Sequence, residues 1–114
     1  MKIINAPVSL KEIKKMAESR FGNLVKAVVD VAKKVMAVDA ELHADEEALL
    51  LQKGSRQSSL WGINLYPEKY GQEEFVEFDS MINLRPSQKN LSRGVDNKDI
   101  QNQIRQIVNQ LVVK

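Results

Sequence analysis

The segment from residue 75 to residue 85 limits the choice of fold more than any other part of the chain, because apolar and polar side chains alternate along it. Successive side chains of a β-strand point to opposite faces, so this alternation predicts a strand with one apolar face and one polar face. The apolar face would hold Val76, Phe78, Ile82 and Leu84, and the polar face Glu77, Asp79, Asn83 and Arg85. Such a strand suits a sheet that has its core on one side.

Two segments carry the signals of amphipathic helices. The first is expected to begin after Ser9, a capping residue followed three positions later by Glu12, and to end at Gly22. The second is expected to begin with Asp96 as its cap. Its apolar stripe consists of Ile100, Ile104, Ile107, Val108 and Leu111. Both stripes require burial, so both helices are predicted to pack on a sheet.

Three further segments have the composition of strands. Residues 24–31 and 35–42 are rich in valine, and the short Ala-Lys-Lys connection between them suits a hairpin. Residues 60–66 form the third segment, which a proline closes. Residues 46–52 fit either a helix or a strand. We favour the strand for them, because it lets the sheet continue through short connections.

These elements predict one α+β domain covering residues 1–114. Its sheet would be an antiparallel meander of four or five strands, with the N- and C-terminal helices packed on one face. A chain of 114 residues is long enough for one core and too short for two domains.

The residue counts exclude several kinds of chemistry. Without cysteine the chain has no disulfide, no thiolate nucleophile and no sulfur-ligated metal, and its one histidine, His43, cannot build a multi-imidazole site. We therefore expect no metal and no cofactor. A net charge of +2 and an aromatic content of 5% disfavour nucleic-acid binding. We expect a cytoplasmic protein outside the membrane, because the N-terminal apolar run is too short for a signal peptide and no segment could span a bilayer.

The sheet face opposite the helices is predicted to be polar. It would gather Glu41, His43, Asn64, Tyr66, Asp79, Asn83 and Arg85. We interpret this face as a binding surface for a small anionic ligand or a protein partner. An exposed sheet face is polar in any soluble protein, so solvation alone explains the same pattern equally well.

Residues 85–93 form a second candidate region for binding. They contain three cations and no acid, together with Ser87, and they lead into the last helix. Cations, hydroxyls and free helix amides suit a phosphate or a carboxylate, although Asp96 would repel an anion there. The expected ligand-binding residues of both regions are Arg85, Arg93, Asn83, Asp79, Asn64 and Ser87.

Two other functions stay open. Glu41 and His43 would share one side of a strand, where the carboxylate could orient His43 as the general base of a small hydrolase- or isomerase-like enzyme. Arg85 or Arg93 would then steady a developing anion. A lone histidine beside acids is more often a hydrogen-bonded surface residue, so this pattern does not decide whether the protein is an enzyme. The other function is structural, with a homodimer formed through the sheet.

Four segments of the sequence resemble those of a known family. They are Glu-Leu-His-Ala-Asp at 41–45, Leu-Leu-Leu-Gln-Lys-Gly-Ser at 49–55, Leu-Trp-Gly-Ile-Asn-Leu-Tyr-Pro at 60–67 and Asp-Ser-Met-Ile-Asn-Leu-Arg-Pro-Ser at 79–87. This combination resembles a family of small prokaryotic proteins known only as a domain of unknown function. The resemblance covers nearly the whole chain. It implies a standalone cytoplasmic protein of about this size, and it assigns no activity.

Overall fold

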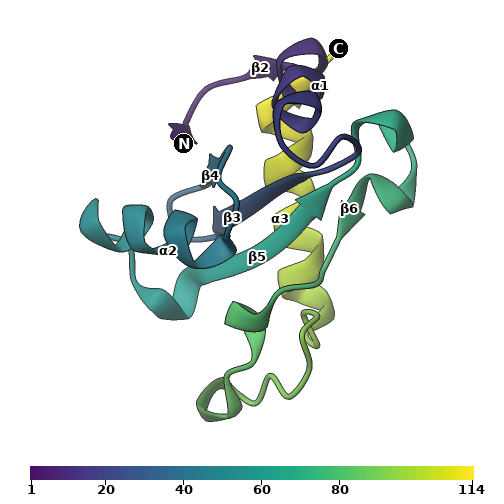
Figure 1. Cartoon of the computed structure of the whole chain (residues 1–114). Coiled ribbons are helices and arrows are strands. Elements are labelled where there is room, and N and C mark those ends of the chain that lie inside the picture. Colours follow the sequence, from purple (N-terminus) through teal and green to yellow (C-terminus); the bar gives the residue numbers. More distant parts are fainter.

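A five-stranded antiparallel sheet organises the chain in the computed structural model, which describes residues 1–114 (Figure 1). The strand order is β1-β4-β3-β5-β6. The strands are β1 (Lys2–Ile4), β3 (Val25–Asp30), β4 (Val35–Val38), β5 (Leu60–Leu65) and β6 (Val76–Glu77). A separate parallel pair joins β2 (Val8–Ser9) to β7 (Val112–Val113).

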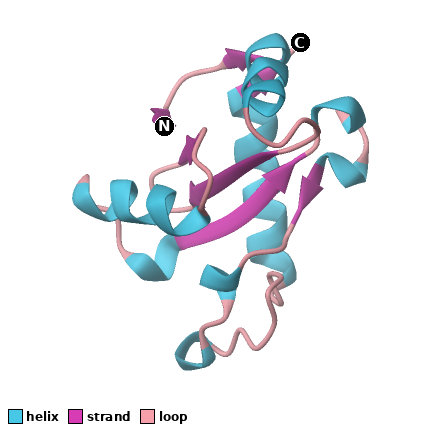
Figure 2. Ribbon diagram, in the orientation of Figure 1, coloured by secondary structure: helices cyan, strands magenta, loops and turns pink.

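Three α-helices pack around this sheet (Figure 2). They are α1 (Leu10–Ser19), α2 (His43–Gln52) and α3 (Lys98–Leu111). Short 3₁₀ turns lie at Gln57–Ser59, Pro67–Lys69, Glu73–Phe75, Met81–Asn83 and Pro86–Gln88. The predicted α+β class and the antiparallel sheet are confirmed. None of the helices is long and apolar enough to cross a membrane.

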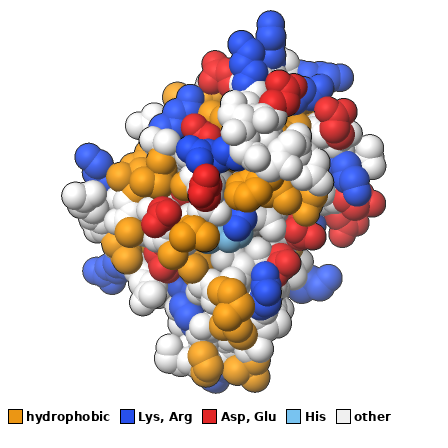
Figure 3. Space-filling view, viewed as in Figure 1, with side chains coloured by type: hydrophobic (Ala, Val, Ile, Leu, Met, Phe, Trp, Pro, Cys, Tyr) orange, Lys and Arg blue, Asp and Glu red, His pale blue; other side chains and the backbone are white.

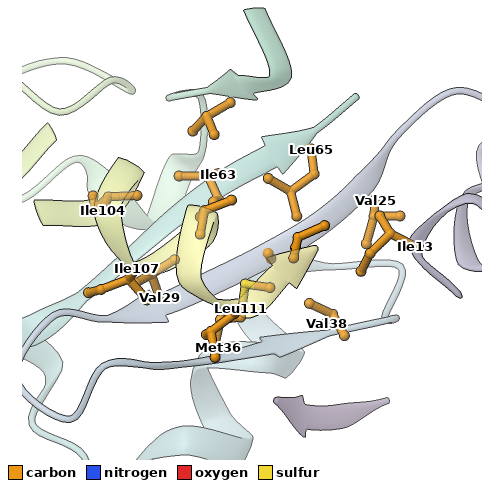
Figure 4. Packing of buried hydrophobic residues seen from close by; sticks show 14 of the residues in the cluster. Ile13, Val25, Val29, Met36, Val38, Ile63, Leu65, Ile104, Ile107 and Leu111 are labelled. Atoms are coloured by element: carbon orange, nitrogen blue, oxygen red, sulfur yellow. The ribbon is translucent and has the colours of Figure 1, made fainter. Parts of the chain in front are cut away.

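The main core lies between the sheet and the two terminal helices (Figure 4). It contains twenty buried residues. The sheet contributes Val25, Ala27, Val29, Met36, Val38, Trp61, Ile63 and Leu65, and α3 contributes Ile104, Ile107, Val108 and Leu111. These sheet residues alternate along their strands, so they lie on one face of the sheet. Both terminal helices lie on this one face, as the sequence predicts.

The helix caps explain where the terminal helices begin. Ser9 Oγ accepts a hydrogen bond of 3.2 Å from the Glu12 amide, which confirms the predicted start of α1. The expected cap of the last helix is wrong by one residue. Asn97 Oδ1 accepts from the Asp99 and Ile100 amides at 2.8 and 3.1 Å, and therefore caps α3. Asp96 instead accepts a bond from the Leu91 amide.

The prediction of a strand at residues 46–52 is wrong, because these residues belong to α2. Leu50 packs against Val28, Ala37 and Leu60 on the face of the sheet opposite the main core. Figure 1 shows α2 in front of the sheet and α3 behind it. The structure therefore has three layers, and the outer sheet face is partly covered. Because α2 carries the chain across this face, β5 pairs with β3 rather than with β4, so the strand order is not that of a simple meander.

The predicted strand at residues 75–85 is wrong over most of its length, because only Val76 and Glu77 pair with β5. Beyond them the Asn83 side chain takes the place of a strand. Its Oδ1 accepts from the Gly62 amide at 2.8 Å, and its Nδ2 donates to the Gly62 carbonyl at 2.9 Å. One side-chain amide thus satisfies both backbone groups of Gly62, and the chain turns away in a 3₁₀ segment.

Gly62 is needed at this contact because the chain passes directly over it. A Cβ built on Gly62 would lie 2.5 Å from Ser80 Cβ. We expect Gly62→Ala to lower the free energy of unfolding by about 2 kcal/mol or more, because residues 80–83 must move away from β5. Urea unfolding measures the change. Gly71→Ala provides a comparison, since nothing lies within 4 Å of its built Cβ and only the strain of its φ of +86° applies. A larger loss in Gly71→Ala would contradict the expectation.

Candidate functional site

The half of the outer sheet face that α2 leaves uncovered carries a row of polar side chains. Lys26 lies opposite Asn64 in the register of β3 and β5, and Asn64 lies opposite Glu77 in the register of β5 and β6. Side chains of directly opposed residues are neighbours on one face. We call Lys26, Asn64 and Glu77 the polar row. The first residue of α2, His43, lies next to this row.

His43 is held in one orientation by the backbone of β5. Its Nε2 lies 2.7 Å from the Ile63 carbonyl oxygen. A carbonyl can only accept a hydrogen bond, so Nε2 carries the proton of the neutral ring and Nδ1 is left as an acceptor. The side chain is 9% exposed. Figure 3 shows part of the ring at the surface, in the middle of the face that carries α2.

The protonation state of His43 follows from its surroundings. Burial lowers the pKa of His43, and the nearby Lys26 ammonium lowers it further. The hydrogen bond to Ile63, the Asp79 carboxylate and the neighbouring Asn64 side chain act in the opposite direction. Because the net shift is downward from the usual 6.5, the ring is neutral at physiological pH and Nδ1 is unprotonated.

Asn64 supplies a second acceptor beside the ring. Its Nδ2 donates to Glu77 Oε1 at 2.9 Å and to the Asp79 carbonyl at 3.4 Å. Its Oδ1 is buried and has no hydrogen-bond partner, and the whole residue is 8% exposed. A buried polar atom without a partner costs about 1–3 kcal/mol, so natural proteins seldom keep one without a reason.

Four charged side chains surround these two acceptors. Glu77 Oε1 also accepts a bond from the Tyr66 hydroxyl at 2.9 Å. Arg93 Nε donates to Asp79 Oδ1 at 2.7 Å. The Lys26 ammonium lies 5.1 Å from the centre of the Phe21 ring. Two cations and two anions therefore leave the site without a strong net charge.

Glu46 lies one helical turn after His43 on the same side of α2 and is fully buried. Its Oε2 accepts a bond of 3.2 Å from the Ala40 amide, and its Oε1 has no partner. Burial raises the pKa of Glu46 to about 9. This carboxyl group is therefore protonated at neutral pH, which the sequence reasoning did not anticipate.

The predicted pairing of Glu41 with His43 is wrong. The chain leaves β4 at Asp39, whose φ is +67°, so residues 41 and 43 do not share a strand. The Glu41 side chain is 77% exposed and lies 3.9 Å from Arg20. The catalytic arrangement built on this pair consequently does not form.

Arg85 is directed into the protein rather than toward solvent. Its guanidinium donates to the Leu60 carbonyl at 2.6 Å and also to the Gln57 carbonyl, and it lies 4.2 Å from the centre of the Trp61 ring. The residue is 9% exposed. Its contacts are therefore those of a residue that fixes the 85–93 segment to the start of β5.

The six residues expected to bind a ligand fall into three groups. Asn64, Asp79 and Arg93 lie together beside His43, as the hydrogen bonds above show. Asn83 and Arg85 are buried in contacts with the backbone of β5 and the turn before it. Ser87 is exposed in the turn Pro86–Gln88. Lys26 is the member of the site that the sequence reasoning missed, although its place between Val25 and Ala27 marks it as an outward residue.

One hollow of the surface, of about 580 Å³, reaches the edge of this site, where Glu77 and Tyr66 line it. The largest of the main hollows, of about 660 Å³, lies between α1, β4 and α2 and is lined by Arg20, Asp39 and Glu41. None of the five main hollows is lined by His43. No group of three His, Cys, Asp or Glu side chains is arranged to hold a metal ion. His43 and Asn64 thus lie outside the main hollows, on the polar surface of an α+β protein.

The family of the chain is established by a match over almost its whole length. The model of the family described as "Protein of unknown function (DUF5674)" matches residues 2–111, so the chain belongs to this family. The resemblance to a domain of unknown function is thereby confirmed. No curated protein and no solved structure matches the chain. The prokaryotic source, the cytoplasmic location and dimerisation stay predictions.

Proposed function

We propose that the protein is a binding protein, and that a protein partner docks on the polar row and places a hydrogen-bond donor at His43 and Asn64. One observation carries the proposal, which is the buried Asn64 Oδ1 without a partner beside a neutral imidazole. Both groups accept hydrogen bonds and neither can donate at these atoms. A hydroxyl, amide or ammonium group of the partner would satisfy the His43 ring directly, and would reach the covered Asn64 oxygen once docking moves the side chains over it.

The surroundings of the polar row favour a protein partner over a small anionic ligand. Phe21, Leu42 and Met81 are large apolar residues with exposed fractions of 41%, 55% and 63%. Phe21 contacts Lys26, Leu42 precedes His43, and Met81 follows Ser80, which packs on Gly62. Protein interfaces combine exposed apolar side chains with a few polar groups that fix the register. An anion would gain little here, because Glu77 and Asp79 balance the two cations.

A titration with small probes tests the chemistry of the site. We expect acetamide, which offers N–H donors, to shift the NMR resonances of the Asn64 side-chain amide and the His43 ring. Acetone, which only accepts, should leave them unchanged. Asn64→Ala should abolish the acetamide effect at His43, because the buried acceptor is removed.

The control for this titration is Asn102→Ala, an exposed position on α3 far from the polar row in sequence and outside its contacts. It should respond to acetamide as the wild type does. Equal shifts with acetone, or no shift with acetamide at a concentration where the protein stays folded, would overturn the proposal.

A further inference from the structure

Residues 80–93, which we call the braced loop, are held to the rest of the protein by buried polar side chains. Asn83, Asn90 and Arg85 are 0%, 3% and 9% exposed. In Figure 2 this segment projects from the end of the sheet below β5 and β6. With Ser80, which is 2% exposed, the loop holds four buried polar residues. Such a number in one loop indicates a single, fixed conformation.

Asn90 organises the second half of the braced loop. Its Nδ2 donates to the carbonyls of Asn83 and Gly94, both at 2.8 Å, and its Oδ1 accepts from the Asp96 amide at 2.9 Å. The backbones of Arg85 and Asn90 also exchange two hydrogen bonds, of 3.0 and 3.2 Å. The loop is therefore a hairpin closed by both backbone and side-chain bonds.

This closure forces apolar side chains outward. Arg85 and Asn90 are opposed and point inward, so Leu84 and Leu91, the next opposed positions, alternate to the outside. Leu84 is 39% exposed and Leu91 is 72% exposed. Met81 adds a third apolar side chain with 63% exposure. Rigidly presented apolar side chains that the core does not use are typical of interaction surfaces.

The charged side chains of the braced loop indicate which kind of partner would bind there. Residues 80–95 contain Arg85, Lys89 and Arg93 and no carboxylate. Arg93 is paired with Asp79, whereas Lys89 lies exposed at the hairpin tip with a φ of +60°. Arg56 is next to this tip, since Gln88 Nε2 donates to the Ser58 carbonyl. Lys89 and Arg56 thus border the apolar residues at the hairpin tip. At the other end lies the Asp96 carboxylate, which accepts a hydrogen bond of 2.9 Å from the Leu91 amide.

We propose that the braced loop is a docking surface for a protein segment that presents apolar side chains flanked by carboxylates. The apolar side chains would pack on Leu84 and Leu91, and the carboxylates would face Lys89 and Arg56. Because the loop is already ordered, binding loses little conformational entropy on this side of the interface. Met81 lies at the border with the His43 and Asn64 site. Leu84, Leu91 and Lys89 belong to the docking surface alone, so the two proposals can fail independently.

Selection from a phage-displayed library of random peptides tests the docking surface. We expect the selected peptides to be rich in Asp or Glu next to Leu, Ile or Phe. The double variant Leu84→Ala/Leu91→Ala should bind them about tenfold more weakly or worse. Both side chains are exposed, so a thermal melt close to that of the wild type is expected for this variant.

Matched variants decide where the peptides bind. Leu42→Ala and Leu51→Ala remove exposed leucines outside the braced loop and should bind the peptides as the wild type does. Failure to enrich any peptide, enrichment of basic peptides, or equal binding by the double variant would overturn the proposal. Weaker binding in Leu42→Ala alone would assign the peptides to the polar row instead. A further outcome would be that a random single-stranded DNA binds the wild type and the double variant equally and does not bind Lys89→Ala. This result would overturn the proposal and indicate nucleic acid as the partner.

Discussion

Replacing Glu46 by Gln should stabilise the protein by on the order of 3 kcal/mol at neutral pH. The pKa of Glu46 rises from 4.5 to about 9 on folding because its carboxyl is buried between α2 and the sheet. The contribution of Glu46 to the free energy of unfolding is therefore fully present below about pH 4.5 and is lost as the pH rises toward 9. Over this range the unfolded chain releases the Glu46 proton, whereas the folded protein keeps it. A Gln side chain keeps an acceptor for the Ala40 amide and has no proton to lose.

The pH dependence distinguishes this cause from a general gain in packing. Urea unfolding of the wild type and Glu46→Gln should give nearly equal free energies near pH 4 and diverge progressively up to about pH 9. Asp45→Asn changes one carboxylate on the exposed side of the same helix and should shift stability by about 0.5 kcal/mol or less. Parallel pH curves for the wild type and Glu46→Gln would contradict the burial of an ionisable carboxyl at this position.

Glu46 also shows why α2 escaped prediction. The residues of α2 that are buried are His43, Glu46 and Leu50, which have the spacing of one helical face. Two of these three are polar, so a search for apolar residues at helical spacing finds no stripe. By contrast, α1 and the sheet strands of the main core follow ordinary apolar periodicity, and their positions could be predicted from the sequence. The buried positions of α2 do have helical spacing, but two of them hold polar side chains, so the pattern of apolar residues did not show the helix.

The sequence predicted only part of the candidate site, because three of the six expected ligand-binding residues lie there and Lys26 was missed. Asn64 and Asp79 were expected on the polar sheet face and Arg93 in the 85–93 region, and the three do lie together. The alternation at residues 75–85 implied a strand, yet Asn83 faces inward in a 3₁₀ turn. A sequence in which apolar and polar residues alternate fits a strand. It fits equally well a bent segment whose polar side chains form hydrogen bonds with backbone groups. Only the tertiary contact with Gly62 distinguishes the two.

That contact leads to the expectation of a large loss of stability in Asn83→Ala. Asn83 is fully buried, and its side chain serves the amide and the carbonyl of Gly62 and, at 2.9 Å, the carbonyl of Arg93. Alanine would remove the side-chain partner of both Gly62 groups and would open a cavity. The Arg93 carbonyl would keep only its bond of 2.9 Å from the Ser80 amide. We expect the free energy of unfolding to fall by about 3–5 kcal/mol, which urea denaturation measures.

Hydrogen exchange adds a readout that separates bracing from general destabilisation. If Asn83 fixes the braced loop, amides of residues 80–96 should lose protection in Asn83→Ala by a larger factor than amides of β3 and β5. Asn102→Ala, on the exposed side of α3, should change stability by about 0.5 kcal/mol or less and leave the loop protected. A uniform loss of protection over sheet and loop would mean that Asn83 stabilises the fold as a whole. The rigidity that the docking surface requires would then have to come from Arg85 and Asn90 alone.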